Sequence, residues 1–277
     1  MGEILSFIFG SIVGSFLNVC IYRMPLGKSV VWPGSHCPKC EKKIPWYDNI
    51  PFISYLLLEG RCRFCKEKIS LRYIVVELLT AIMFVLFFRY YGLSYDFFVY
   101  LVLACSLIIA TFVDIKHRII PDEISLGGIA IGFIFSIVRN IIQPWSPVDH
   151  SIINLFLYPP PVLDSFLGIL MGGGIIYSIG KVFDWVYFKK LKKPPIQGET
   201  ESMGGGDVKL LAMIGAFLGW QKAILTFFLA PFFGLIIGVI NLIFKKDHTI
   251  PYGPFLSLAA LLSLLWADKI IGLIFIR

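Results

Sequence analysis

The chain has 277 residues, of which 57% are hydrophobic and 16% charged, and its mean hydropathy is +0.79. Soluble domains carry about 45–50% apolar and about 25% charged residues, so this composition excludes an ordinary soluble domain. Several apolar runs approach or exceed the ~18 residues typical of a transmembrane helix. We therefore predict an all-α polytopic membrane protein. The net charge of +7 would suit a nucleic-acid-binding protein, but the distribution of the basic residues argues against that function.

The apolar runs predict about eight transmembrane helices, with seven as the alternative. In chain order the runs are residues 4–22, 73–91, 97–115, 124–142, 162–187, 207–219, 221–244 and 252–276. Run 207–219 covers roughly 20 Å at about 1.5 Å per residue, which is less than the ~30 Å hydrocarbon core. We expect this run to tilt, to thin the bilayer around it or to be re-entrant. No basic residues precede the first run and no cleavage site is evident, so a removable signal peptide is not expected.

The basic residues alternate between loops in a way that sets the orientation. Ten Lys and Arg lie in residues 23–72, and smaller groups follow in 116–123, 188–206 and 245–251. The intervening loops 92–96 and 143–161 contain none. By the positive-inside rule, the N-terminus is outside and the 23–72 loop is cytoplasmic. The positive charge therefore indicates topology and attraction to anionic lipid, not binding of nucleic acid.

Four cysteines form two pairs in the long polar loop. The pairs are Cys37-Pro38-Lys39-Cys40 and Cys62-Arg63-Phe64-Cys65, with 21 residues between them. Two such pairs at this separation are typical of a tetrahedral four-thiolate zinc site. Structural disulfides are disfavoured because the loop is predicted to lie in the reducing cytoplasm. A structural zinc ion is the main prediction, and redox or vestigial use of the cysteines is the alternative.

Two aspartates lie at the ends of apolar runs. Asp114 ends the third predicted span, and Asp207 begins the sixth, directly after three glycines. Both ends face the cytoplasm in the predicted topology, so the two carboxylates share a membrane face and a depth. Two acids close together in a poorly hydrated site hold one proton between them. The ionised acid then takes a proton from water while the protonated acid polarises a peptide carbonyl, which is the chemistry of aspartic proteases.

Three other interpretations of this pair remain open. The aspartates could be structural charges neutralised by Lys116, Arg118 or Lys209. They could also be relay carboxylates of an ion- or proton-coupled transporter. Finally, the chain could be a non-catalytic assembly factor whose zinc loop docks a partner. The position of both acids at one face, together with the absence of a visible repeat, favours the enzyme over the transporter.

Weaker features receive structural interpretations. Glu77, about one turn inside the second span, is expected to pair with a basic neighbour. Gly172-Gly173-Gly174 is expected to form a helix-packing surface instead of a phosphate loop. His36 is expected to be a solvated loop residue, and Glu201 is either a solvated charge or a contributor to the site.

With these motifs in place, the sequence closely resembles the type IV prepilin peptidases along nearly its whole length. The matching motifs are, in chain order, Gly14-Ser15-Phe16-Leu17-Asn18-Val19 with Tyr22-Arg23, Trp46-Tyr47-Asp48-Asn49-Ile50-Pro51 between the cysteine pairs, Ile69-Ser70-Leu71-Arg72-Tyr73 through Glu77, the GxGD motif Gly204-x-Gly206-Asp207, and Pro251-Tyr252-Gly253-Pro254-Phe255. The GxGD motif alone is short and unspecific, whereas the combined order of the motifs is highly specific.

The resemblance implies that Asp114 and Asp207 are the catalytic pair of a membrane aspartic endopeptidase. It implies that Cys37, Cys40, Cys62 and Cys65 hold zinc. The implied substrates are prepilin and pseudopilin precursors, which lose their leader at the cytoplasmic face of the inner membrane. Members with this zinc loop often also methylate the new N-terminal amine with S-adenosylmethionine, although no Rossmann-type site for the methyl donor is visible.

These inferences divide the chain into three parts. Residues 1–22 are predicted to be the first transmembrane helix. Residues 23–72 form the cytoplasmic zinc loop, and residues 73–277 form the transmembrane aspartyl protease core. The lipid bilayer is an expected partner, and nucleic acid is not.

Overall fold

The computed structural model describes residues 1–145, 158–190, 204–244 and 251–275. Over these ranges the named elements are all helices, accompanied only by two isolated antiparallel bridges, His36 with Lys43 and Arg61 with Lys68. The predicted all-helical class is confirmed. The chain divides into two compact units, Met1–Val113 and Asp114–Arg277, and we describe each unit by itself.

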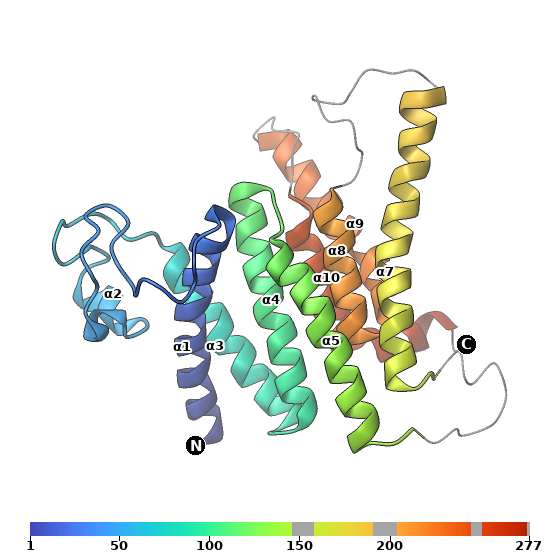
Figure 1. Ribbon diagram of the computed structural model, residues 1–277, viewed down its shortest axis with the longest axis horizontal. Coiled ribbons are helices and arrows are strands. Elements are labelled where there is room, and N and C mark those ends of the chain that lie inside the picture. The colour runs from blue at the N-terminus through green and yellow to red at the C-terminus, as the bar shows by residue number, and fades with distance from the viewer. Residues whose placement is uncertain (146–157, 191–203, 245–250, 276–277) are drawn as a thin grey trace. The chain divides into compact units, whose positions relative to one another are not determined.

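The first unit is built on two antiparallel helices, α1 (Gly2–Arg23) and α3 (Arg72–Tyr91), which lie side by side in Figure 1. Glycines at one-turn spacing let the two backbones approach closely. A Cβ atom on Gly10 would lie 2.7 Å from the Cα of Ala81, and one on Gly14 would lie 2.7 Å from the Cα of Glu77. The seam between α1 and α3 therefore admits no side chain at these two positions.

The long loop between α1 and α3 contains only short helical segments. They are η1 (Met24–Leu26), η2 (Trp46–Asn49) and α2 (Ile53–Leu57). The buried guanidinium of Arg23, at the end of α1, donates to the carbonyls of Ser29 and Gly34 at 3.1 and 3.0 Å. These hydrogen bonds tie the start of the loop to the helix that precedes it.

Helix α4 (Tyr95–His117) follows α3 after a short connection. It contacts α3 through aromatic side chains, because the ring of Phe97 meets those of Phe84 and Phe88 edge-on. The helix belongs to the first unit as far as Val113, and its last residues belong to the second. Asp114 is therefore part of the second unit.

The second unit surrounds one short helix, α8 (Gly205–Leu218), with α5 (Asp122–Ile142), α7 (Pro161–Asp184), α9 (Trp220–Phe244) and α10 (Gly253–Phe275) (Figure 1). A π-helical segment, η3 (Trp185–Lys190), continues α7. Every residue from Leu210 to Leu218 is buried. Because its neighbours cover it, α8 needs little contact with lipid.

Glycines again set the distance between the packed helices. Gly128 and Gly132 of α5 face Met213 and Phe217 of α8, and Gly168 of α7 meets the backbone of Gly215 in α8. A Cβ atom on Gly172 would lie 2.6 Å from the carbonyl oxygen of Leu211. The interpretation of the glycine run in 162–187 as a packing surface is therefore confirmed for Gly172.

Six helices in the described ranges are long and apolar enough to cross a membrane. They begin at Gly2, Arg72, Tyr95, Asp122, Pro161 and Trp220. Helix α8 has 14 residues, and α10 supplies a further apolar segment over Gly253–Ala267. The protein is a multi-span membrane protein, and the eight-span count stays a prediction. Most of loop 188–206 with Glu201, much of loop 143–161, and Lys245-Lys246 lie outside the described residues.

Candidate active site and metal centre

Asp114 lies in the last turn of α4 and is 6% exposed. The helix ends at His117. The N–H of the next residue, Arg118, donates to the Asp114 carbonyl at 2.8 Å, and its φ of 56° is left-handed. The Asp114 side chain accepts a 2.8 Å hydrogen bond from the backbone N–H of Gly253, the first residue of α10. An anion at a helix N-terminus is favoured because the first N–H groups have no partner within the helix.

Asp207 is the third residue of α8 and is half-buried. Of the three preceding glycines, Gly206 has a close neighbour. Gly204 precedes the helix and accepts the Asp207 N–H at 3.0 Å, and a Cβ atom on Gly206 would lie 3.2 Å from that of Ile120. Gly206 therefore lets the start of α8 lie against the segment that follows α4.

The structure places the two predicted aspartates near each other. Their carboxylates are close enough for the charge of Asp114 to act on Asp207. The charge of Asp207 also acts on Tyr252, which directly precedes the Gly253 that hydrogen-bonds Asp114. Acids from α4 and α8, separated by 93 positions in the sequence, thus lie within electrostatic range of each other around the start of α10.

The basic residues proposed as neutralising partners do not fill that role. Lys209 forms a 2.7 Å ion pair with Asp122 of α5, so its positive charge is already compensated by that carboxylate. The charge of Arg118 is felt by Asp114, but no ion pair links these residues or Lys116 to either aspartate within the described ranges. The interpretation of the aspartates as structural ion pairs therefore loses its support.

Tyr252 is a site neighbour whose role the sequence did not single out. Burial of its side chain, followed by the charge of Asp207, raises the pKa of Tyr252 to about 12. The hydroxyl group therefore stays protonated at physiological pH and can donate a hydrogen bond. The only signal in the sequence was the proline- and glycine-rich segment that opens the last apolar run.

The four predicted cysteines also come together. Their sulfur atoms all lie within 4.8 Å of one another, the Sγ atoms of Cys37 and Cys65 are 3.7 Å apart, and all four thiols are free. Tetrahedral zinc with Zn–S bonds of about 2.3 Å places its sulfurs about 3.8 Å apart. The cluster therefore fits a four-thiolate metal ion, and His36 is not part of it.

The two cysteine pairs have the same backbone conformation. The N–H of Cys37 donates to the carbonyl of Lys42 at 3.0 Å, and that of Cys62 donates to Glu67 at 2.8 Å. The residue after each second cysteine is left-handed, with φ of 57° at Glu41 and 58° at Lys66. Each pair is thus a tight turn that presents two sulfurs to one side.

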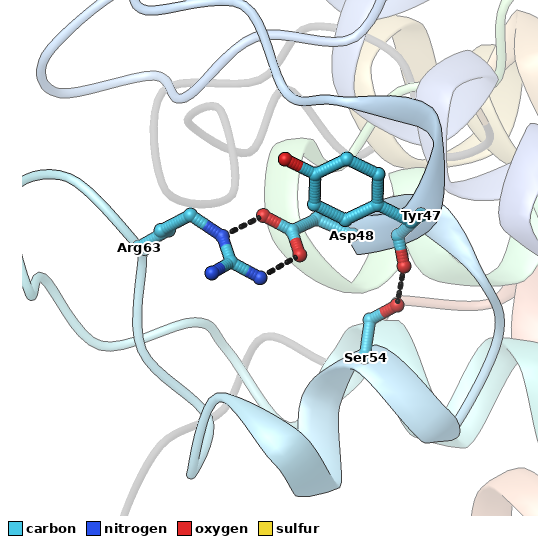
Figure 2. Close-up of polar contacts among 4 residues, drawn as sticks. All are labelled: Tyr47, Asp48, Ser54 and Arg63. Atoms are coloured by element: carbon cyan, nitrogen blue, oxygen red, sulfur yellow. Dashed lines mark hydrogen bonds and ion pairs between the residues drawn. The ribbon is translucent and has the colours of Figure 1, made fainter.

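Ion pairs hold the zinc loop together around the cluster. Lys39 of the first turn contacts Glu67 of the second at 2.5 Å. Figure 2 shows the Arg63 guanidinium donating two 2.6 Å hydrogen bonds to Asp48, and the Ser54 hydroxyl donating to the Tyr47 carbonyl at 2.9 Å. The guanidinium lowers the pKa of Asp48, so this carboxyl is ionised at neutral pH.

Comparison with known proteins identifies the family of this chain. Residues 8–91 match the bacterial peptidase A24 N-terminal domain, and residues 101–239 match the type IV leader peptidase family. Prepilin leader peptidase/N-methyltransferase from Pseudomonas putida is 32% identical over 291 residues, covering 96% of this chain and 91% of that protein. The chain belongs to the type IV leader peptidase family.

Other relatives with the same name agree with this membership. The Pseudomonas aeruginosa protein is 32% identical over 95% of this chain and 90% of its own length. The Myxococcus xanthus protein is 34% identical over 86% of this chain, which here spans only 62% of the relative. No solved structure matches the chain. Leader peptidase membership gives no support to the transporter alternative.

Within this leader peptidase, the expectation for Glu77 is wrong. Glu77 is 8% exposed. In place of a basic side chain, it contacts the Phe52 N–H at 3.3 Å and the Ser15 hydroxyl. The basic residues of α3 are Arg72, at its start, and Arg89, in its last turn. The reason is that the zinc loop folds back and supplies a backbone donor instead.

Proposed function

We propose that this leader peptidase removes the leader from prepilins and pseudopilins with Asp114 and Asp207 as its catalytic pair. Family membership and the names of the relatives support prepilin processing. The observation that supports the residue assignment is the position of the two acids beside Tyr252-Gly253, within electrostatic range of each other and without an ion pair to either acid in the described residues.

The pair acts as one titrating unit that holds a single proton at working pH. The N–H of Gly253 favours Asp114 as the carboxylate that keeps its charge, because a donor stabilises an ionised acceptor. Asp114 then takes a proton from the attacking water, and Asp207 donates its proton to the peptide carbonyl oxygen. The peptide carbonyl becomes a tetrahedral diol without a covalent bond to the enzyme, and collapse of the diol expels the new amine.

We also propose that the four cysteines hold a structural zinc ion. A closed four-thiolate shell leaves no position for a catalytic water. When bound, the metal supplies folding energy to a loop that has few buried apolar residues. The side chains of this loop do not enter the proteolytic steps above.

The orientation is part of the same proposal. The concentration of Lys and Arg in loop 23–72 supports a cytoplasmic zinc loop, an outside N-terminus and an active site at the cytoplasmic face of the inner membrane. A precursor anchored by its own apolar helix would present its leader at this face. The relatives are also named N-methyltransferases, so methylation of the new N-terminus from S-adenosylmethionine belongs to the proposed activity.

The experiment incubates the purified full-length protein with a prepilin, with and without S-adenosylmethionine, and weighs the products by mass spectrometry. Asp114→Asn and Asp207→Asn should each abolish cleavage, because neither acid can fill both roles. Glu123→Gln, which removes an exposed acid from the first turn of α5 and leaves the Lys209–Asp122 ion pair intact, is the matched control and should cleave normally. Cleavage that survives either site substitution in folded protein would rule out the catalytic pair.

A further inference from the structure

The seam between α1 and α3 contains a buried carboxylate without a cation. Glu77 accepts from one backbone N–H and one hydroxyl, and no ion pair to it occurs among the described residues. An ionised carboxylate inside a membrane protein is costly unless a positive group accompanies it. Within the described residues, no positive group therefore compensates the charge that Glu77 carries when it is ionised.

A second acceptor lies in the same seam. Asn18 is 1% exposed, and its Nδ2 donates to the carbonyls of Gly14 at 3.3 Å and Tyr73 at 3.0 Å. Two carbonyl partners require the amide NH₂ on that side, so the orientation of the amide is fixed. Its Oδ1 is buried and has no hydrogen-bond partner. A buried acceptor left unpaired costs free energy that a donor would recover.

The two acceptors lie about one helical turn apart along the α1–α3 seam. Asn18 lies at the level of Tyr73, and Gly14 lies at the level of Glu77. Asn18 is four residues from Gly14 in α1, and Glu77 is four residues from Tyr73 in α3. At about 1.5 Å per residue, Asn18 and Glu77 therefore differ in height by roughly 6 Å. The Ser15 and Phe52 residues that contact Glu77 are only half-buried, so the carboxylate can be approached from their side.

Non-helical backbone also reaches this level of the helices. Phe52 has a φ of 60°, its N–H contacts Glu77 in the second turn of α3, and its ring stacks on Phe7 of α1 at 5.9 Å. Irregular backbone at membrane depth is tolerated only where protein buries it or water reaches it. The zinc loop thus contributes directly to the surroundings of Glu77.

We propose that Glu77 and Asn18 bind the N-terminal α-ammonium group of the cleaved pilin and form the amine site for its methylation. An ammonium group supplies the positive charge that Glu77 lacks and several N–H donors, one of which suits Asn18 Oδ1. The proposal rests on the proposed function, because the leader must be cut before this amine exists.

The residues have defined tasks in the transfer. Glu77 takes one proton from the ammonium, which frees the nitrogen lone pair. The nitrogen attacks the methyl carbon of the sulfonium donor, so that an N–C bond forms while the S–C bond breaks and its electrons stay on sulfur. The peptide leaves as a methylammonium, the donor becomes a neutral thioether, and Glu77 releases its proton to water.

The first test supplies full-length enzyme with a pre-cleaved pilin peptide and S-adenosylmethionine, so methylation is measured without cleavage. Glu77→Gln should lower the methylation rate by about 100-fold. The defect should shrink above about pH 8, where the free amine no longer needs a base. Thr80→Val is the matched control, because Thr80 is equally buried one turn further along α3 and bonds only to its own helix.

Cleavage of a prepilin by the same proteins separates this proposal from the catalytic pair. Glu77→Gln should cleave at the normal rate, which also demonstrates that it folds, whereas Asp207→Asn should methylate the pre-cleaved peptide without cleaving a prepilin. Unimpaired methylation by Glu77→Gln, or an equal loss at every pH, would overturn the amine site while leaving the proteolytic assignment intact.

The second test measures peptide binding without the methyl donor. A peptide with a free N-terminus should bind the wild-type protein roughly 10-fold or more tightly than the same peptide with an acetylated N-terminus. Glu77→Gln should abolish this preference, and Asn18→Leu should weaken it. An unchanged preference in Glu77→Gln, or a raised KM for S-adenosylmethionine alone, would refute binding of the peptide ammonium at Glu77.

Discussion

The backbone N–H of Gly253 and the carboxylate of Asp114 are joined by a 2.8 Å hydrogen bond across 139 positions of sequence. This contact fixes the start of α10 against the end of α4. Because Tyr252 precedes Gly253 and the charge of Asp207 acts on it, the same segment lies beside both acids. The geometry of the proposed catalytic pair therefore depends on a segment that carries no acid of its own.

Gly253→Ala should impair cleavage. A Cβ atom at this position would lie 2.8 Å from Asp114 Oδ2, so either the carboxylate or the start of α10 must shift. A displacement of about 1 Å at a reacting group can cost on the order of 100-fold in rate. Gly174→Ala is the control, because its Cβ atom would meet nothing within 4 Å. Cleavage assays on both variants check this, and equal rates would contradict the positioning role of Gly253.

Removal of the metal should unfold the loop between α1 and α3. Cys62→Ser, or treatment with a strong chelator, should release about one zinc ion per chain and expose residues 30–70 to added protease. The packing of α8 in the second unit should persist, since it uses no residue of the loop. X-ray absorption of the untreated protein should show four sulfur ligands. Nitrogen or oxygen in the first coordination shell would be inconsistent with the four-cysteine site.

Asp48→Asn should destabilise the zinc loop, and the loss of stability should be the same at every pH near neutrality. The Arg63 guanidinium lowers the pKa of Asp48, so the pair stabilises the loop above the unfolded-state pKa of about 3.9 and loses this effect as pH falls through the lower folded-state pKa. Between pH 5 and 8 the carboxylate stays ionised. Because Arg63 is 46% exposed, zinc loss to a chelator should be accelerated less than about fivefold. A defect that changes across this range would point to another titrating group.

Gly215→Ala should destabilise the second unit. A Cβ atom there would collide with the backbone of Gly168 in α7, and backbone cannot move aside as a flexible side chain can. Overpacking of this kind costs about 1–3 kcal/mol. Thermal unfolding of the purified protein in detergent should show a lower midpoint than for Gly174→Ala, whose added methyl group meets open space. Equal midpoints would mean that α7 and α8 are less closely packed than described.

Much of this architecture was predictable from sequence because membrane helices have a strong compositional signal. The apolar runs predict the helices α1, α3, α4, α5, α7 and α9 that are long enough to span. Cysteine spacing predicts the cluster of Cys37, Cys40, Cys62 and Cys65. The topology predicts that Asp114 and Asp207 share one end of the bundle, since two intervening helices return the chain to the side it left.

Contacts between distant segments were not predictable. The surroundings of Glu77 depend on a loop residue, Phe52, whose backbone donates to it, and no periodicity in the sequence reports such a contact. The partner of Lys209 is Asp122, not the nearby Asp207, because sequence distance does not determine which side chains meet in a helix bundle. The closeness of Gly168 to Gly215 likewise follows from how α7 and α8 cross.

Asp164, in the first turn of α7, accepts the N–H of Trp220 at 3.1 Å and so anchors α9 as Asp114 anchors α10. A mutational scan of the acidic residues that scores only processed pilin will therefore report both positions as essential. A misassembled Asp164 variant would be degraded or would aggregate, whereas an Asp114 variant would accumulate as intact but inert protein. Protein abundance measured alongside processing therefore distinguishes an acid that holds two helices together from an acid that takes part in catalysis.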